Sequence, residues 1–476
     1  MLIVGGNQSA AGGYNVDNSL RFDDGSSDYL QWNSSPSGNR QKFTYSVWFK
    51  RSSVGNTQIL ASASFSGSDE GYLFLSGGGA LGWQSTNGGD GNLSLSRLFR
   101  DFSAWYHLVW SVDTTQATAS NRMKFYINGV QETSFSTETY PNINQSLYWN
   151  VGGTYYPYIG RRAGGDYFDG YMAEVVHINN QQLDATSFGE FDEDTGIWKP
   201  IDVSELTFGT TGYYLDFEDS AALGDDVSGN GNDFTVNNLT SIDQSTDTCT
   251  NNFATLNPIQ AALSSATFSE GNLKSVTAGT AGENYGGCSS IGVASGKWYF
   301  EAKATVGSGA ADRNVIGVTG EASNIAYNKS YTGTSSTVQY QSYNGQVLSN
   351  NTTIEYTGSL YATGDIIQIA LDIDNLHVYF GKNGTWQNSG DPTSGATGTG
   401  AVDLVAISST TDGFYFVYHG DNSGASGPVS TFEFNFGSPS YSESGGNSDG
   451  NGYGNFNQSV PSGYYALNTK NLAEYG

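Results

Sequence analysis

The stretch WYHLVWSVDTTQATASNRMKFYING, residues 105–129, decides the fold because it contains a complete antiparallel hairpin. Trp105–Val112 is an aromatic and β-branched run, which is typical of a half-buried strand. Asp113–Asn121 is polar and lacks apolar periodicity, so it predicts a loop. Met123–Ile127 is the second strand, and Asn128-Gly129 closes it with the strongest short hairpin signal.

The same plan recurs late in the chain. Ile366–Ile373 has alternating apolar residues, and Asp374-Asn375 follows as a turn. Leu376–Phe380 alternates again, and Asn383-Gly384 closes it. Two copies of one hairpin plan predict an all-β protein with two β-sandwiches in tandem and short helical connections at most.

The first hairpin resembles the W-x-H-[LV]-[AV]…[LF]-Y-[IV]-[ND]-G core of laminin-G-like, concanavalin A-like jelly rolls. Three more segments resemble that family's opening, second and closing strands, in the same order: Ser19–Leu30, Phe43–Lys50 and Ile159–Val175. The resemblance covers residues 18–190. It implies a jelly-roll binding module, and relatives of this kind often hold Ca²⁺ at one rim.

The second hairpin lies within a stretch that resembles SPRY domains, over residues 270–472. Gly296–Glu301 (GKWYFE) resembles their S-G-[KR]-[HW]-Y-[WF]-E strand, and Ile316–Val318 resembles their I-G-[VI] strand. Gly364–Asp372 follows G-D-x-[IV]-G-[IV]-x-[LV]-D, with Gln368 in place of the glycine. The resemblance implies a module that binds partners through loops at one end and is not an enzyme.

These patterns predict four segments. They are an N-terminal arm at residues 1–17, a laminin-G-like jelly roll at 18–196, a bridging segment and linker at 197–268, and a SPRY-like sandwich at 269–476. The Ser/Thr/Asp-rich stretch Ser241–Thr250 is the best linker candidate. The polar arm has two readings, a frayed tail or a segment that orders against a partner subunit.

Composition excludes several function classes. Only 14% of the 476 residues are charged, against about 25% in an average soluble domain. The net charge of −27 argues against a nucleic-acid or anionic-membrane partner, because both need a basic face. The start MLIVGGNQSAAGG lacks the features of a signal peptide, and no apolar run reaches membrane-spanning length. We therefore expect synthesis in a cytoplasm without export by the general route and without membrane insertion.

One aromatic cluster is a candidate glycan platform, since aromatic rings stack on sugar C–H surfaces. Its members are Trp149, Tyr155, Tyr156, Tyr158 and Tyr167. Packing in the core or at a subunit interface is the alternative interpretation.

Two oxygen-rich loops are candidate Ca²⁺ ligands, Asp23–Asp28 and Asp166–Asp169. Their spacing matches no defined Ca²⁺ loop, and solvated turns explain such residues better. We therefore predict no cofactor, with Ca²⁺ as the open alternative.

Catalytic patterns are sparse. Glu190–Asp194 resembles the E-x-D-x-x-E strand of laminarinase-type glucanases, but Thr195 stands where the third carboxylate belongs. Cys249 and Cys288 are expected to be free thiols, because two cysteines do not make a disulfide framework. The four histidines are isolated in the sequence: His107, His177, His377 and His419. We predict that the protein is not an enzyme.

The chain's ending narrows the function. Ser462–Leu472 (SGYYALNTKNL) and Asn251–Pro258 (NNFATLNP) resemble segments of SPRY-containing structural proteins of tailed bacteriophages, many of them marine. This implies a virion structural or adhesion protein, such as a tail fibre or tail appendage, assembled in the host cytoplasm. Its expected partners are other virion proteins, further copies of itself as a trimer, and a host-surface glycan or receptor. A capsid-surface decoration or fibre protein and a cellular glycan-binding lectin remain alternatives.

Overall fold

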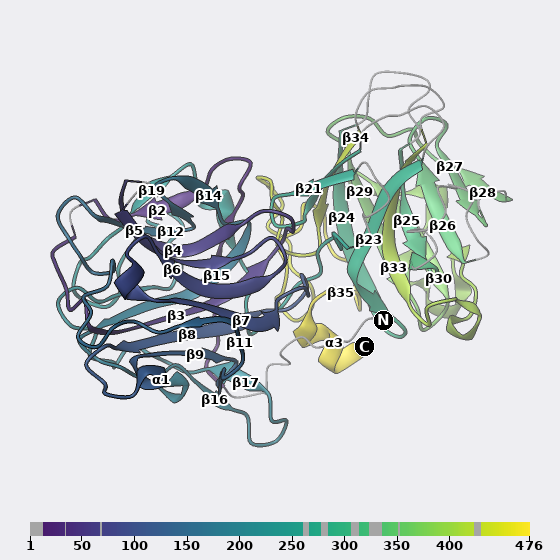
Figure 1. Ribbon diagram of the computed structural model, residues 1–476. Coiled ribbons are helices and arrows are strands. Elements are labelled where there is room, and N and C mark those ends of the chain that lie inside the picture. Colours follow the sequence, from purple (N-terminus) through teal and green to yellow (C-terminus); the bar gives the residue numbers. More distant parts are fainter. Residues whose placement is uncertain are drawn as a thin grey trace. The chain divides into compact units, whose positions relative to one another are not determined.

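The computed structural model describes residues 13–33, 35–66, 69–259, 266–277, 284–305, 314–322, 336–350, 353–422 and 430–476. The chain divides into two compact units (Figure 1), and the first ends at Asn252 while the second begins at Phe253. Each unit is built from sheets that are antiparallel except where the short β35 (Tyr465–Ala466) pairs parallel with β24 (Lys297–Thr305), which confirms the predicted all-β fold. Among the described residues, no helix is long and apolar enough to cross a membrane.

The deciding hairpin forms as predicted. β8 (Tyr106–Asp113) pairs antiparallel with β9 (Met123–Ile127). Asn128 and Gly129 then join β9 to β10 (Val130–Gln131), and both residues have positive φ, at 47° and 80°. A two-residue type I′ turn requires positive φ at both positions, which explains why Asn-Gly stands there.

The first unit has two principal sheets. The first sheet runs in the order β10, β9, β8, β3 (Lys42–Arg51), β15 (Gly170–Asn179), β1 (Ser19–Phe22) and β20 (Gln244–Ser245), and β18 (Tyr213–Leu215) also pairs with β15. The second sheet runs in the order β11 (Phe135–Thr139), β7 (Asn92–Leu98), β6 (Ala80–Ser85), β5 (Asp69–Leu75), β4 (Gln58–Ser66), β12 (Tyr156–Ile159), β2 (Tyr29–Gln31) and β19 (Thr235–Asn237). Residues from both sheets interdigitate in one apolar core, as the alternation in β8 shows, where Leu108, Trp110 and Val112 all point inward.

Short elements complete this unit. They are the hairpins β13 (Arg161–Arg162) with β14 (Gly165–Tyr167) and β16 (Gly189–Phe191) with β17 (Trp198–Pro200), and the helical turns α1 (Ala119–Arg122), η1 (Gly88–Asp90), η2 (Ala185–Ser187) and η3 (Ser241–Asp243).

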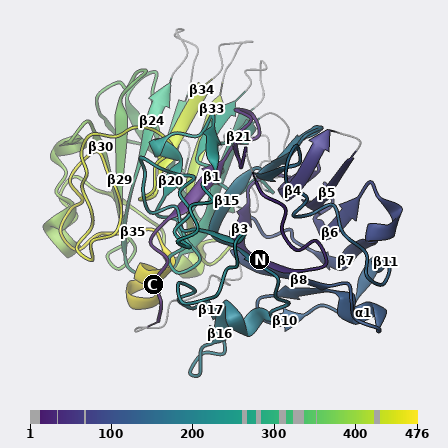
Figure 2. The same cartoon turned by 90° about the vertical axis from the view of Figure 1, so that its left-hand side faces the viewer.

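Most of the predicted bridge belongs to the first sandwich. β18 pairs with β15, and β19 pairs with β2. β20 pairs with β1, beside β15 (Figure 2). The expected end of the jelly roll at residue 196 is therefore too early, and residues 197–252 add strands to both of its sheets. The strands are three residues long or shorter, and such lengths leave little alternation to detect in the sequence.

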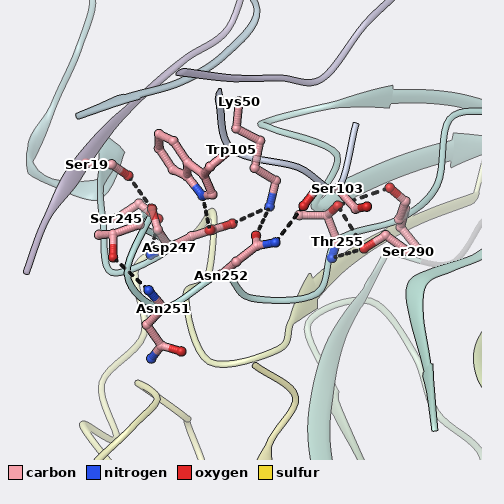
Figure 3. Close-up of polar contacts among 12 residues, drawn as sticks. Ser19, Lys50, Ser103, Trp105, Ser245, Asp247, Asn251, Asn252, Thr255 and Ser290 are labelled. Carbon is pink, nitrogen blue, oxygen red and sulfur yellow. Dashed lines mark hydrogen bonds and ion pairs between the residues drawn. The ribbon is translucent and has the colours of Figure 1, made fainter. Parts of the chain in front are cut away.

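The predicted linker, Ser241–Thr250, is part of this sandwich, and its second half is buried from Asp247 to Thr250. Lys50 Nζ lies 2.7 Å from Asp247 Oδ2 and 2.7 Å from Asn252 Oδ1 (Figure 3). The Trp105 indole N–H donates to Asp247 Oδ1 at 3.0 Å, and the Ser19 hydroxyl donates to the Asp247 carbonyl at 2.6 Å. The polar composition that predicts a solvated linker instead supplies partners for a buried lysine.

The described end of the predicted arm is also part of the sandwich. Val16 is buried in an apolar cluster with Trp105 and Cys249, and its N–H donates to Thr250 Oγ1 at 3.1 Å. The Tyr14 hydroxyl contacts the Tyr214 hydroxyl at 3.1 Å. Residues 14–17 are therefore not a free arm, and residues 1–12 lie outside the described part of the chain.

The second unit is also a pair of sheets. One runs β21 (Ala266–Ser269), β22 (Lys274–Thr277), β34 (Ser430–Asn435), β24 (Lys297–Thr305), β29 (Ile366–Asp372), β30 (His377–Lys382) and β31 (Thr385–Trp386), with β32 (Val402–Asp403) on β30 and β35 (Tyr465–Ala466) on β24. The other runs β23 (Asn284–Val293), β33 (Tyr415–Asn422), β25 (Asn314–Thr319), β26 (Thr337–Gln341), β27 (Gln346–Ser349) and β28 (Thr353–Thr357). Helical turns η4 (Gln387–Ser389), η5 (Pro392–Thr397), η6 (Ile407–Ser409) and the C-terminal helix α3 (Thr469–Tyr475) lie outside the sheets.

The second unit begins earlier than residue 269. Phe253, Ala254 and Leu256 are buried in its apolar clusters, and the Ala254 N–H donates to the Leu467 carbonyl at 2.9 Å. The predicted hairpin is present as β29 and β30. Gln368, which departs from the family pattern, is buried and accepts a hydrogen bond from the Gly384 N–H at 2.7 Å.

Candidate functional site

One face of the second sheet of the first sandwich points away from the core. Leu30 of β2, Leu73 of β5 and Ile159 of β12 enter the core, so their strand neighbours face outward. Register confirms this, because Tyr158 lies opposite Ser62, and Ser62 lies opposite Tyr72. We call this surface the outer face. It carries residues from four adjacent strands: Tyr29, Gln31, Tyr156, Tyr158, Ser62, Ser64, Glu70, Tyr72 and Phe74.

The β13–β14 hairpin packs on β4, in the middle of the outer face. The Ser62 hydroxyl donates to the Arg161 carbonyl at 2.9 Å, and Arg162 Nη1 lies 2.5 Å from Glu70 Oε1. Ser62 and Glu70 point away from the core yet are only 1% and 0% exposed. The hairpin therefore covers polar groups that an open sheet would leave in water.

Arg161 lies among three tyrosine rings of this surface. Its guanidinium carbon is 4.4 Å from the ring centroid of Tyr29, 5.1 Å from that of Tyr158 and 5.3 Å from that of Tyr167. Tyr29 and Tyr167 come from β2 and β14 and remain half-buried. This cation–π cage holds the arginine side chain in one orientation.

The five predicted platform residues do not form one surface. Trp149 is 3% exposed and packs in the core against Phe43 and Trp110, so it is wrongly assigned to a glycan platform. Tyr155 stacks on Tyr148, away from the Arg161 cage. Tyr156 and Tyr158 share the outer face, and Tyr167 joins them through the hairpin.

The sequence did not identify Tyr29, Arg161 or Arg162 as residues of this site. The position of Tyr29 next to Leu30 could have indicated its role. Side chains alternate along a strand, so Tyr29 faces away from the core that Leu30 enters. Arg161 and Arg162 follow Ile159-Gly160 directly, but nothing in the sequence shows that their hairpin folds back over the sheet.

The two oxygen-rich loops meet at one rim of this sandwich. The carboxylate oxygens of Asp23, Asp24 and Asp169 lie within 4.8 Å of one another. We call these three residues the rim acids. The Ser52 hydroxyl donates to Asp169 Oδ1 at 2.6 Å, and Asp28 Oδ2 accepts the Asp23 N–H at 3.0 Å. The separate loops of the sequence therefore supply a single cluster.

Burial raises the pKa of several carboxyl groups at this rim. It raises the pKa of Asp169 to about 7 and that of Asp28 to about 6, and it also raises the pKa of Asp24. Within the described ranges, no lysine or arginine forms an ion pair with the rim acids, and Asp28 Oδ1 is buried without a hydrogen-bond partner. Three convergent carboxylates with a spare buried oxygen beside them fit a hard divalent cation such as Ca²⁺.

The Glu190–Asp194 stretch has the wrong electrostatics for glycoside hydrolysis. Lys199 Nζ lies 3.3 Å from Glu190 and 3.2 Å from Asp192. Hydrogen bonds from the Thr195 backbone N–H and hydroxyl, with Lys199, lower the pKa of Asp192 to about 2. A general acid for this chemistry needs a raised pKa, so Asp192 lacks the required property.

His107 is equally unsuited to activating a nucleophile. The Trp198 indole N–H donates to His107 Nδ1 at 2.9 Å, so the neutral ring carries its proton on Nε2. That Nε2–H then donates to the Ser46 hydroxyl at 2.8 Å, the reverse of what a general base does. Burial lowers the pKa of His107 to about 3, which keeps the ring neutral.

Comparisons with known proteins agree with the two architectures. Residues 24–186 match the family described as the concanavalin A-like lectin/glucanases superfamily, and residues 297–415 match the SPRY domain. These matches confirm a laminin-G-like, concanavalin A-like domain followed by a SPRY domain.

Solved structures similar to this chain include the SPRY domain of human HERC1, at 17% identity over 38% of this chain and 96% of that one, with a TM-score of 0.29. A heptameric SAP-like pentraxin from Limulus polyphemus is similar at 16% identity over 36% of this chain and 80% of that one, with a TM-score of 0.26. No curated protein sequence matches the chain.

Proposed function

We propose that this chain is a non-enzymatic adhesion protein that binds a glycan on the outer face of its first sandwich. The observation that carries the proposal is the pair of half-buried tyrosines Tyr29 and Tyr167 around Arg161, with the half-buried Tyr156 on the same face beside Tyr158. Rings that are held in place and partly open to solvent can stack on a sugar at little entropic cost. The match to a superfamily of lectins and glucanases supports a carbohydrate ligand.

The rim acids would hold a divalent cation in this proposal. Ca²⁺, when bound, would supply the positive charge that neutralises the three carboxylates. The chain's own contribution is orientation, since the Ser52 hydroxyl fixes Asp169 and the Asp23 N–H fixes Asp28. Tyr29 directly follows this loop, so ordering of the loop would also order one wall of the Arg161 cage.

Glycan binding is tested with the full chain on an array of neutral and charged oligosaccharides, with Ca²⁺ or EDTA present. We expect retention on the array, loss of retention in Tyr29→Ala and Tyr156→Ala, and no release of reducing sugar. Phe191→Ala is the matched control, because Phe191 is 48% exposed and lies on β16, which pairs with β17 and not with the strands of the outer face. Absence of glycan binding, or hydrolysis abolished by Glu190→Gln, would overturn the proposal.

At a finer level, we propose that the chain is a virion structural protein, in a tail fibre or tail appendage and as a trimer. The resemblance of SGYYALNTKNL and NNFATLNP to phage structural proteins supports this, as does the low share of charged residues, which suits subunit interfaces. Mass spectrometry of purified particles should detect the chain in multiple copies. Deleting residues 1–12, which leaves the buried Val16 in place, should abolish incorporation if the arm docks onto the particle. Absence from particles would overturn this assignment and leave glycan binding standing.

A further inference from the structure

The Arg161 guanidinium is held in place, but not all of its hydrogen-bond donors have an acceptor among the described residues. The three tyrosine rings of its cage surround it. Along the edge, Nε donates to the Arg162 carbonyl at 3.1 Å and Nη2 donates to the Ala163 carbonyl at 3.4 Å. Among the described residues, none accepts a hydrogen bond from Nη1, and none forms an ion pair with this arginine.

In the neighbouring Arg162, by contrast, carboxylates of the chain accept hydrogen bonds from Nε, Nη1 and Nη2. Arg162 Nη1 lies 2.5 Å from Glu70, and its Nε and Nη2 lie 2.8 Å and 2.6 Å from Asp166 Oδ2. The hairpin therefore orders two adjacent arginines in opposite ways. Arg162 is fixed by carboxylates of the chain, whereas Arg161 is fixed by rings and carbonyls that leave its charge uncompensated.

An uncompensated arginine is notable in this chain. Acidic residues number 46 against 19 basic residues, so a carboxylate partner is the expected neighbour of any cation. A guanidinium edge recognises carboxylates and sulfates through paired, charge-assisted hydrogen bonds. Rings and backbone carbonyls have already ordered the side chain, so an anion that binds it loses little affinity to ordering.

We propose that the outer face selects a sugar bearing a carboxylate or sulfate, with the anion on the Nη1 edge of Arg161. This inference rests on the proposed glycan binding and names the class of glycan. Tyr29 and Tyr156 offer ring faces for the sugar, and Arg161 supplies the charge that distinguishes an acidic sugar from a neutral one. Asp166, the acidic side chain of the hairpin, is held by Nε and Nη2 of Arg162 at 2.8 Å and 2.6 Å, so its carboxylate is bound to that arginine and not to Arg161.

The test measures binding of the full chain to three oligosaccharides of one length by calorimetry. They end in glucuronate, in glucose 6-sulfate, and in glucose. We expect the wild-type chain to prefer at least one acidic ligand by about tenfold or more, the usual value of a charge-assisted hydrogen bond. The glucuronate and sulfate arms show which anion the site takes.

Arg161→Gln should remove that preference while changing the affinity for the neutral sugar less than about twofold, because only the charged contact is lost. Arg161→Lys should not restore it, since an ammonium lacks the planar edge and the stacking. Arg97→Gln is the matched control, because Arg97 lies on β7, is half-exposed and forms an ion pair with Glu132. Melting temperatures of all variants check folding.

Equal affinity of the wild-type chain for all three ligands, or an acidic preference that survives Arg161→Gln, would overturn the inference and leave glycan binding intact. Failure of all three ligands, together with a blank glycan array, would instead overturn the proposed function.

Discussion

Two groups of buried carboxylates in the first sandwich differ in what faces them. Asp247 has Lys50 at 2.7 Å, and both side chains are almost fully buried. The rim acids Asp23, Asp24 and Asp169 face one another without an ion pair among the described residues. A buried charge is tolerable only when it is paired, neutralised by a proton or bound to a cation. We therefore read the first group as structural and the second as a site that awaits a proton or a cation.

The largest effect is expected for the paired group. Asp247→Asn would leave the buried Lys50 without its charge partner, and such losses cost about 3–5 kcal/mol. Differential scanning calorimetry of the full chain should show an early transition for the first sandwich and an unchanged one for the second.

Lys42→Met is the matched control for this substitution. Lys42 pairs with Asp113 at 3.0 Å, but its side chain is 38% exposed, so its removal should cost no more than about 1 kcal/mol. Equal losses for the two variants would erase the distinction between a buried pair and a surface pair.

A smaller effect of opposite sign is expected for the rim acids. Burial raises the pKa of Asp169 to about 7, above its ordinary value, so its contribution to stability is complete below about pH 4 and is lost as the pH rises through 7. In EDTA at pH 8, Asp169→Asn should therefore be more stable than wild type, by about 2–4 kcal/mol at most. Thermal unfolding of both proteins from pH 4 to pH 8 measures the difference directly.

Ca²⁺ should reverse this ranking. A cation at one hundred times its Kd stabilises the native state by about 2.7 kcal/mol, and only the wild-type protein retains all three ligands. Glu190→Gln, which alters an exposed acid paired with Lys199, should leave the Ca²⁺ effect unchanged. If the melting temperature of the wild-type protein changes with neither EDTA nor Ca²⁺, the rim acids bind no Ca²⁺ and only protons neutralise them.

The same two groups of carboxylates show which parts of the structure can be predicted from the sequence. Both sandwiches and both hairpins follow from alternation and from Asn-Gly turns, because these signals are local. The burial of Asp247 is not local. It depends on Lys50 and Trp105, which lie nearly 200 and 142 residues away along the chain, and Ser/Thr/Asp composition alone looks the same in a linker.

The candidate site was predicted in part for the same reason. Acidic loops at 23–28 and 166–169 stood out, but only the closed jelly roll brings them together. The aromatic cluster stood out too, yet Trp149 turned inward while its neighbours turned outward. One residue of offset decides which face a strand residue takes, and irregular connections between strands hide that offset.

Glu174 is a third kind of buried carboxylate and gives the smallest expected effect. The Tyr214 hydroxyl donates to its Oε2 at 2.8 Å and the Tyr14 hydroxyl lies 3.5 Å away, while no described cation pairs with it. Burial raises its pKa to about 8, so the carboxyl group is protonated and neutral at pH 6. At pH 4, where the carboxyl group is protonated in the folded protein and largely protonated in the unfolded chain, Glu174→Gln keeps shape and neutrality and should change stability by less than about 1 kcal/mol.

The sign of this effect should change with pH. The raised pKa means that the wild-type protein loses stability as the pH rises through 8, whereas the Gln variant has nothing to ionise. At pH 9.5 the variant should therefore melt above wild type, because the wild-type protein loses about 1.4 kcal/mol for each pH unit between the ordinary glutamate pKa and 8, with no further loss above pH 8. Glu190→Gln, at an exposed carboxylate, serves as the control and should show no such crossing. If Glu174→Gln instead became more destabilising at pH 9.5, the ionised carboxylate would need a cationic partner, and Glu174 would belong with Asp247 among the paired, structural acids.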